Sequence, residues 1–212
     1  MKQYTTYLFD FDYTLADSSR GIVMCYQTVL NRHGYMDVSV EMIKSTIGKT
    51  LEDSFALMTG ISDYDTLMTM KREYVAVADK IMTDNTKLFP ETAEVLTRLK
   101  ASGAKVGIIS TKYRYRIKEC LDRHIPADTI DLIVGGEDVS VAKPHPEGLL
   151  FAISHLNSGK EETLYIGDSV VDAETAAAAG VDFGAILHGV TTADELTRYP
   201  HVAVMSDLRE LL

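Results

Sequence analysis

Two carboxylates, Asp10 and Asp12, stand at the end of an apolar run near the start of the chain, TTYLFDFDYT. Residues two apart on an extended segment point the same way, so these carboxylates repel each other unless a cation or a shared proton offsets their charge. Asp168 and Asp172 stand in a second acidic segment, GDSVVD. A Mg²⁺ ion suits such a group of acids, because it takes hard oxygen ligands and prefers sites shared with phosphate.

A hydroxyl and an ammonium group are available to bind that phosphate. Ser110 opens the segment STK after an apolar run, and Lys143 lies in the segment AKPHP. Together with backbone N–H groups, these side chains can hold phosphate oxygens, and the lysine does so as a point charge. The residue types therefore favour chemistry on a phosphate group, provided that the fold brings the four segments together.

Short apolar runs alternate with amphipathic segments over most of the chain. Strands are expected at residues 5–11, 104–109, 130–134, 163–166, 183–187 and 202–205. Helices are expected between them, at residues 91–102, 114–123, 146–156 and 172–179. This alternation predicts βαβ units and a parallel sheet. In an open sheet of this kind the ligand crevice lies beyond the carboxyl ends of the strands, where the candidate residues stand.

The stretch from residue 16 to residue 84 interrupts this alternation, because its apolar residues recur at helical spacing and it contains no convincing strand. Ser18 is expected to cap its first helix. We therefore expect an α/β fold with a Rossmann-like, doubly wound parallel sheet and an inserted helical bundle. The core would comprise residues 1–15 and 85–212, and the inserted domain residues 16–84.

The composition limits the classes of partner. Lys and Arg number 21 and Asp and Glu 31, so the net charge is −10. This negative charge argues against a nucleic-acid or anionic-membrane surface. The segment YRYR at residues 113–116 is expected to be one turn of helix. Cys25 and Cys120 have no metal-ligand spacing and make no disulfide framework. A reduced, cytoplasmic location is expected, with no signal peptide and no membrane span.

The four segments, taken in order, resemble the motifs of the haloacid dehalogenase-like hydrolase superfamily. The resemblance covers nearly the whole chain and implies a Mg²⁺-dependent phosphatase that works through an aspartyl-phosphate. It implies that Asp10 is the nucleophile and that Asp12 is the general acid and base, with its carbonyl oxygen on the metal. Thr14 would orient this segment.

The other motifs carry the remaining roles that the resemblance implies. Ser110 and Lys143 would bind the transferring phosphoryl group, and Thr111 and Thr14 are also expected among the substrate- or phosphate-binding residues. Asp168 would be a carboxylate ligand of Mg²⁺. Asp172 would bind the metal through water or would orient Lys143. The implied metal-site residues are therefore Asp10, Asp12, Asp168 and Asp172.

The inserted helices resemble the small cap of the phosphoglycolate phosphatase-like branch, and the segment IGKTL at residues 47–51 resembles its substrate loop. Lys49 or Thr50 could contact a carboxylate or second phosphate of the substrate, although Lys49 could equally be a solvated loop lysine. Tyr13 stands where the branch usually has glycine, and we expect it to narrow the entrance beside Asp12. His188 is expected to be structural or exposed rather than catalytic.

The substrate remains open at this point. A small phosphorylated metabolite is expected, with 2-phosphoglycolate as the first candidate. Inorganic pyrophosphate hydrolysis and a β-phosphoglucomutase-like reaction are alternatives within the fold. A dehalogenase would not need Asp12, and a non-catalytic binding protein would not need both Asp10 and Asp12. The chain is expected to be a monomer or a homodimer without nucleic-acid or membrane partners.

Overall fold

A computed structural model describes residues 2–212 of the chain. Its main sheet is parallel, with the strand order β5-β4-β1-β6-β7-β8. The strands are β1 (Thr6–Phe9), β4 (Lys105–Ile109), β5 (Leu132–Val134), β6 (Thr163–Gly167), β7 (Asp182–Ile186) and β8 (Ala203–Met205). The expected α/β fold with a parallel sheet is confirmed.

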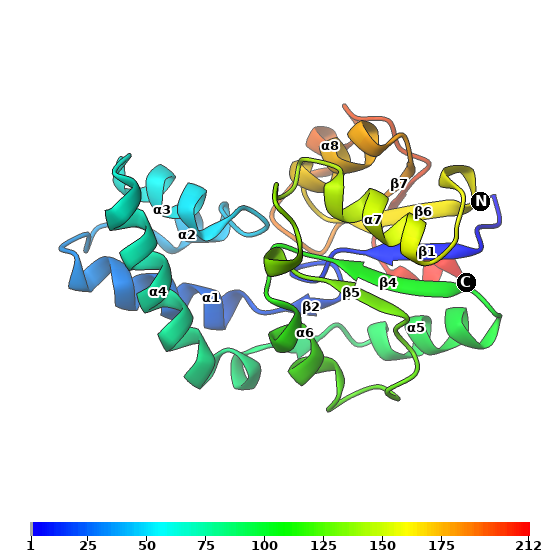
Figure 1. Ribbon diagram of the computed structural model, residues 1–212, viewed down its shortest axis with the longest axis horizontal. Helices are drawn as coiled ribbons and strands as arrows, with labels where there is room; N and C mark the ends of the chain where they lie inside the picture. Colours follow the sequence, from blue (N-terminus) through cyan, green and yellow to red (C-terminus); the bar gives the residue numbers. More distant parts are fainter. Residues whose placement is uncertain (1) are drawn as a thin grey trace.

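Helices cover both faces of this sheet (Figure 1). One face packs on α5 (Thr92–Ala101), α6 (Arg114–Leu121) and the C-terminal 3₁₀ turn η4 (Leu208–Leu211). The other face packs on α7 (Glu147–His155) and α8 (Val170–Ala179), with the short α9 (Ala193–Leu196) beside them. The 3₁₀ turns η2 (Gly136–Asp138) and η3 (Lys160–Glu162) lie in the loops. The buried central strands are almost continuously apolar, as a sheet covered on both faces requires.

The strand register aligns the ends of the three central strands. Phe9 of β1 pairs with Ile108 of β4 on one side and with Ile166 of β6 on the other. The residues that follow these strands, among them Asp10 and Ser110, therefore emerge at the same edge of the sheet. This edge is the carboxyl edge, where ligands bind in open α/β sheets.

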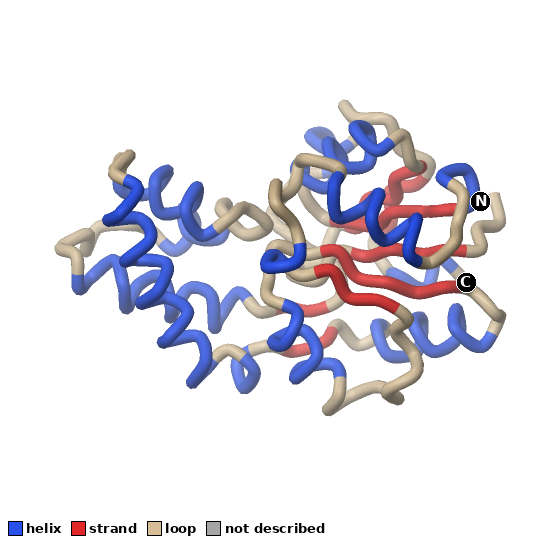
Figure 2. The backbone as a smooth tube through the Cα atoms, in the orientation of Figure 1, coloured by secondary structure: helices blue, strands red, loops and turns tan. Residues whose placement is uncertain are grey.

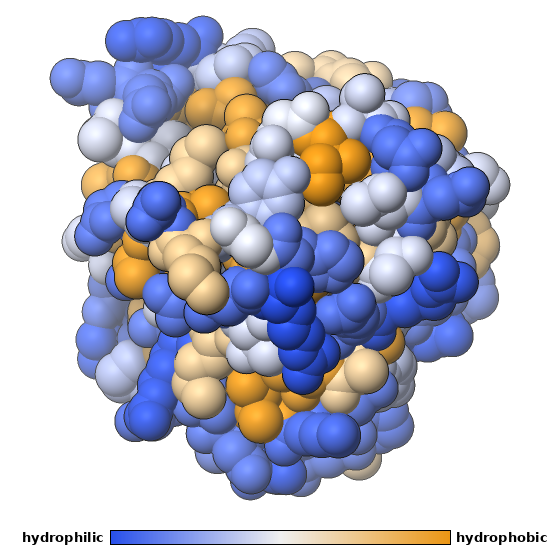
Figure 3. All heavy atoms as spheres, turned by 90° about the vertical axis from the view of Figure 1, so that its left-hand side faces the viewer, coloured by the Kyte–Doolittle hydropathy of each residue, from blue (hydrophilic) through white to orange (hydrophobic). Residues whose placement is uncertain are grey.

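Residues 19–81 form four helices to one side of the sheet (Figure 2), which we call the helical segment. They are α1 (Ser19–Arg32), α2 (Val40–Lys44), α3 (Leu51–Thr59) and α4 (Tyr64–Ile81), followed by η1 (Thr83–Asn85). Tyr26, Phe55 and Tyr74 pack edge-on or tilted in a hydrophobic cluster that belongs to this segment alone. The end of the helical segment is mostly hydrophilic, with scattered apolar side chains (Figure 3).

Two short strands join the helical segment to the sheet. Ala16–Asp17 (β2) pairs antiparallel with Lys87–Leu88 (β3), so the chain leaves and returns at one place. This pair was not predicted, because two-residue strands carry no periodicity. No helix within residues 2–212 is long and apolar enough to cross a bilayer.

The observed ends of several elements differ from the predicted ones by a few residues. The first strand ends at Phe9 rather than residue 11, because the chain turns after Asp10 and Ala16 N–H bonds back to the carbonyl of Phe11. The helix predicted at 172–179 begins at Val170, because Ser169 caps it by accepting a hydrogen bond from the Asp172 N–H group. The predicted cap Ser18 does occupy the N-cap position of α1, but its hydroxyl makes no capping bond.

Candidate active site

Three buried carboxylates meet at the carboxyl edge of the sheet. Asp10 follows β1, Asp168 follows β6, and Asp172 lies in the first turn of α8. One carboxylate oxygen from each of the three lies within 4.8 Å of the others. Carboxylate oxygens at this spacing are the donor set that a hard divalent cation takes. The structure therefore brings together three of the four acids expected to form the metal site.

Lys143 reaches this group of acids from the loop before α7. Its Nζ lies 2.8 Å from Asp10 Oδ1 and 2.6 Å from Asp172 Oδ1, and the side chains of all three residues are at most 5% exposed. The lysine also donates to the Tyr165 hydroxyl at 3.2 Å. A buried ammonium between two carboxylates offsets part of their repulsion. Lys143 thus lies where the sequence predicted a cation.

The protonation of this group follows from burial and like charge. Burial raises the pKa of Asp10 to about 7, the charges of Asp172 and Asp12 add to the rise, and Lys143 opposes it. Burial also raises the pKa of Asp168 well above its usual value, with Asp172 and Asp10 adding to it. For Lys143, burial lowers the pKa, but the two adjacent carboxylates outweigh burial and raise it well above its usual value. Without a further cation, Asp10 and Asp168 therefore bind protons more readily than exposed carboxylates do.

Asp172 has hydrogen-bond donors on both of its oxygens. Lys143 and the Tyr165 hydroxyl (2.8 Å) donate to Oδ1, and the Ser169 N–H and hydroxyl groups donate to Oδ2. A Cβ atom on Gly167 would lie 2.4 Å from the Cβ of Asp172, so this close approach requires glycine. Asp172 is held firmly in the position where it orients Lys143.

Asp12 lies on the side of the site that faces the helical segment, and its carboxylate has partners of its own. Lys112 Nζ lies 2.8 Å from Asp12 Oδ1 and 2.9 Å from Oδ2, and the Ser18 hydroxyl donates to Oδ1. The sequence did not assign Lys112 or Ser18 to the site. The carboxylate of Asp12 therefore lies outside the three-acid group, because it turns toward Lys112. The structure thus differs from the expected site, in which four carboxylates converge.

The predicted hydroxyl residues lie around the same edge. The Thr14 hydroxyl donates to Asp168 Oδ1 at 3.3 Å. Ser110 is buried, and its Oγ accepts from the Lys112 N–H group at 3.3 Å. Thr111 donates to the Gly48 carbonyl at 3.4 Å, which ties this loop to the helical segment. Thr14 contacts one of the three acids directly, whereas Ser110 and Thr111 follow β4 at the same edge of the sheet.

A cleft of about 60 Å³ lies between Asp12 and the helical segment. The charged side chains along it are three cations, Lys49, Lys112 and Arg116, and one carboxylate, Asp12. Apolar and aromatic side chains such as Ile22 and Tyr74 form the remaining walls. Lys112 is paired with Asp12 and Arg116 with Asp79, so within residues 2–212 Lys49 is the cation of this lining that no carboxylate holds, and its positive charge suits an anionic ligand.

Two side chains near the cleft, Tyr13 and Thr50, make other contacts. Tyr13 is buried with a φ of 60° and is not among the residues that line the cleft. The Thr50 hydroxyl caps α3 by accepting from the Asp53 N–H group, and it donates to the Asp53 carboxylate. Lys49, by contrast, is exposed and reaches the cleft.

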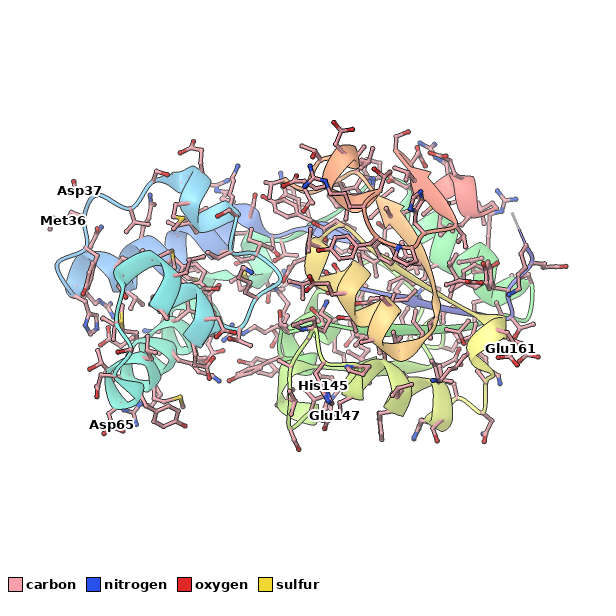
Figure 4. The ribbon with its side chains drawn as sticks, turned by 90° about the horizontal axis from the view of Figure 1, so that it is seen from above. Met36, Asp37, Asp65, His145, Glu147 and Glu161 are labelled. Carbon is pink, nitrogen blue, oxygen red and sulfur yellow. The ribbon has the colours of Figure 1, made fainter. Side chains whose placement is uncertain are left out.

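His145 and His188 differ in their exposure to solvent. His145 lies at the surface close to Glu147 (Figure 4), with its side chain 52% exposed. His188 is buried between the Thr14 carbonyl and Glu91. Neither histidine lies among the three acids.

The profile of one known family matches residues 7–186, and it describes haloacid dehalogenase-like hydrolases. The chain belongs to this family. This hydrolase is 57% identical to a haloacid dehalogenase-like hydrolase of known structure from Bacteroides fragilis, with a TM-score of 0.97 over 99% of this chain and 100% of that one. It is 30% identical to the phosphoglycolate phosphatase of Aquifex aeolicus, over 86% of this chain and 84% of the relative. The hydrolase also shares 28% identity with a protein from Caldanaerobacter subterraneus named pyrophosphatase PpaX, over 98% and 93% of the two chains.

The family membership, the placement in the phosphoglycolate phosphatase-like branch and the enzyme class expected from the sequence are thereby confirmed: this hydrolase is a phosphatase.

Proposed function

We propose that this phosphatase hydrolyses small phosphorylated metabolites that carry a second negative charge, through an aspartyl-phosphate on Asp10. The observation that carries the proposal is the juxtaposition of Asp10, Lys143 and Asp168 at one sheet edge, beside a cleft rich in cations. The first candidate substrate is 2-phosphoglycolate, on which the relative from Aquifex aeolicus is named to act.

The acids fit a Mg²⁺ ion. Asp10 and Asp168 are buried, lie close together and have raised pKa values, so a divalent cation would remove a repulsion that Lys143 leaves in place. These two carboxylates and the Asp12 carbonyl would hold the ion, whereas Asp172 would orient Lys143, because both of its oxygens already accept hydrogen bonds. When bound, Mg²⁺ supplies positive charge to the phosphoryl oxygens.

The chemistry takes two displacements at phosphorus. In the first, an Asp10 oxygen forms a bond to phosphorus while the ester P–O bond breaks, and Asp12 protonates the leaving oxygen. In the second, Asp12 takes a proton from water, whose oxygen attacks phosphorus and releases inorganic phosphate and Asp10. Lys143 and Ser110 hold the phosphoryl oxygens, which is the positioning and charge stabilisation that such transfers need.

The helical segment supplies the part of the site that differs among substrates. Residues 16–84 would act as a cap on a core of residues 1–15 and 85–212, excluding water while the aspartyl-phosphate forms. Lys49 and Lys112 would bind the anionic end of the leaving group. Inorganic pyrophosphate is the second candidate substrate, because the same cations suit a second phosphate.

A cytoplasmic location is part of the proposal. Cys25 and Cys120 are both free and buried, and burial raises the pKa of each thiol to about 11. Such thiols are poor nucleophiles, and they suit a compartment without disulfide bonds.

Phosphate release from a panel of about fifty phosphorylated metabolites, with Mg²⁺ and with EDTA, tests the proposal. We expect turnover to require Mg²⁺ and to fall by at least about 10³-fold in Asp10→Asn, because the nucleophile is lost. Full activity of Asp10→Asn would disprove the mechanism. A preference for neutral leaving groups would disprove the substrate class while leaving the mechanism intact.

A further inference from the structure

His188 lies where three separate segments of the core meet. Its ring stacks on Phe89, with ring centroids 4.1 Å apart. Nδ1 lies 3.2 Å from the Thr14 carbonyl oxygen, and Nε2 lies 3.1 Å from Glu91 Oε1. The side chains of His188 and Glu91 are only 9% and 7% exposed. The three segments are the loop after β1, the chain returning from the helical segment and the loop after β7.

The groups that face the two ring nitrogens of His188 determine which nitrogen can donate a hydrogen bond. A backbone carbonyl oxygen can only accept, and an ionised carboxylate can only accept. The Thr14 carbonyl therefore accepts a hydrogen bond from Nδ1–H, and Nε2 faces the Glu91 carboxylate at 3.1 Å. His188 and Glu91 thus form a close pair with little exposure to solvent.

This pair connects directly to the surroundings of Asp168. The Thr14 hydroxyl donates to Asp168 Oδ1 at 3.3 Å. Gly189, which follows His188, packs so tightly that a Cβ atom there would lie 2.0 Å from Asp168 Oδ2. Thr14 and Gly189 are thus two walls of the space that Asp168 occupies, and His188 joins the segments that carry them.

Glu91 fixes the other side of the ring to the chain returning from the helical segment. Leu88 pairs with Ala16, and the Phe89 N–H group donates to the Leu15 carbonyl at 3.1 Å. Thr92 donates its hydroxyl to the same carbonyl at 2.7 Å. The returning chain is therefore anchored next to the loop that carries Asp10 and Asp12, and Glu91 extends this anchor to His188.

We propose that His188 and Glu91 are positioning residues that set the place of Asp168 for metal binding. The inference rests on the proposed function, in which Asp168 binds Mg²⁺. The pair touches neither substrate nor metal. It acts through the Thr14 carbonyl and the backbone at Gly189, so loss of the pair displaces Asp168 and weakens Mg²⁺ binding.

Three variants of the full chain separate this role from a general effect on folding. The double variant H188F/E91L keeps the junction packed and apolar but removes the Nδ1–H bond to Thr14 and the polar contact with Glu91, without leaving one buried charge unpaired. E91Q retains a polar group beside Nε2, and Nδ1–H still donates to Thr14. T92V removes the side-chain hydrogen bond to Leu15, one of the other ties of the returning chain, and leaves His188 and Glu91 untouched.

The measurement is the Mg²⁺ dissociation constant by calorimetry, alongside kcat, KM and the unfolding temperature. We expect H188F/E91L to raise the Mg²⁺ dissociation constant by at least about tenfold, the usual effect of losing an outer contact to a metal ligand. Its KM at saturating Mg²⁺ is expected to change little. E91Q and T92V should bind Mg²⁺ within about twofold of the parent, whatever their unfolding temperatures.

An unchanged dissociation constant in H188F/E91L would overturn the inference, as would an equal loss in T92V, because either result assigns the pair a structural role only. Failure of the unaltered protein to bind Mg²⁺ would instead refute the proposed function, and the inference with it. The two failures are therefore distinguished by which protein shows them.

Discussion

Lys112 holds both carboxylate oxygens of Asp12, with its Nζ 2.8 Å from one and 2.9 Å from the other. The lysine side chain is only 7% exposed and also borders the cleft between the core and the helical segment. Its ammonium group is therefore shared between the proposed acid and base and the space for the leaving group. A leaving group with its own negative charge can draw Lys112 away from Asp12, whereas a neutral one cannot.

Lys112→Met is expected to reduce discrimination between leaving groups. We expect kcat/KM for 2-phosphoglycolate to fall by about tenfold relative to 2-hydroxyethyl phosphate, because a hydrogen bond to a charged group contributes about 1.5–3 kcal/mol. Steady-state phosphate release with the two esters measures the ratio. Lys118→Met, on the helix α6 that begins two residues after Lys112, exposed and paired with Asp122, is the control and should leave the ratio unchanged. Equal losses on both esters would argue against a role in selectivity.

The stability of the metal-free protein is expected to fall as the pH rises from about 4 through about 7. Asp10 has a pKa of about 7 in the folded protein and an ordinary value near 3.8, so between these values the folded state holds a proton that the unfolded state has lost. The free energy of unfolding then decreases with rising pH. Thermal unfolding in EDTA across this range measures the trend, and Asp10→Asn should flatten it. A rise in stability over the same range in EDTA would contradict the raised pKa.

Added Mg²⁺ is expected to reverse this trend. The ion competes with the protons on Asp10 and Asp168, so it binds more tightly at pH 8 than at pH 5 and adds more stability there. The difference between unfolding temperatures with Mg²⁺ and with EDTA should therefore grow with pH. Ca²⁺ provides a comparison, since it prefers more ligands at longer distances. A Mg²⁺ effect that is largest at pH 5 would exclude these carboxylates as its ligands.

Tyr13 combines a buried side chain with a backbone conformation that favours glycine. Its φ is 60°, which costs a residue with a Cβ about 1–2 kcal/mol, whereas loss of a buried aromatic side chain costs about 3–5 kcal/mol. Burial outweighs strain, so Tyr13→Gly should lower the free energy of unfolding by about 2 kcal/mol. Asn157→Gly, at an exposed residue with a φ of 48°, should change it by less than about 0.5 kcal/mol. Denaturant unfolding compares the two, and a more stable Tyr13→Gly protein would show that strain dominates.

Arg116 ties α6 of the core to α4 of the helical segment. Its Nη2 donates to Asp79 at 2.7 Å and to the Val75 carbonyl at 3.0 Å, and the side chain is only 6% exposed, whereas that of Asp79 is 48% exposed. Arg116→Met should therefore cost about 2 kcal/mol of stability, because it removes charge-assisted hydrogen bonds from a buried place. Asp79→Asn should cost less than about 1 kcal/mol, since its carboxylate is screened by water. Urea unfolding measures both, and equal costs would mean that the Val75 contact contributes nothing.

The parts of the site that follow strands were predictable from sequence, and the parts that depend on side-chain contacts were not. Asp10, Ser110 and Asp168 could be grouped because parallel strands end at one edge, and the register places them there. The pairing of Lys112 with Asp12 spans 100 residues, and no periodicity reports the direction in which a side chain leaves a loop. Ser18 has the residue type of a helix cap, yet its hydroxyl bonds to Asp12 instead.

The contacts of His188 could not be predicted from the sequence for a related reason. Its neighbours Thr14, Phe89 and Glu91 come from two distant segments, and a lone histidine after a strand has no ligand spacing. The two-residue strands β2 and β3 were hidden by their length. The helices were easier to find, because apolar side chains at helical spacing cover several turns, and only their ends shifted by one or two residues.

The antiparallel pairing of Ala16–Asp17 with Lys87–Leu88 has a consequence for how such proteins can be rebuilt. Because the chain leaves the sheet and returns to it at neighbouring positions, the helical segment is attached to the core in the same way as a surface loop. A different helical bundle with the same spacing between its ends could be grafted at this pair without altering the register of β1, β4 and β6. In the proposed function, the sheet would then keep its chemistry while the exchanged helices changed the choice of substrate.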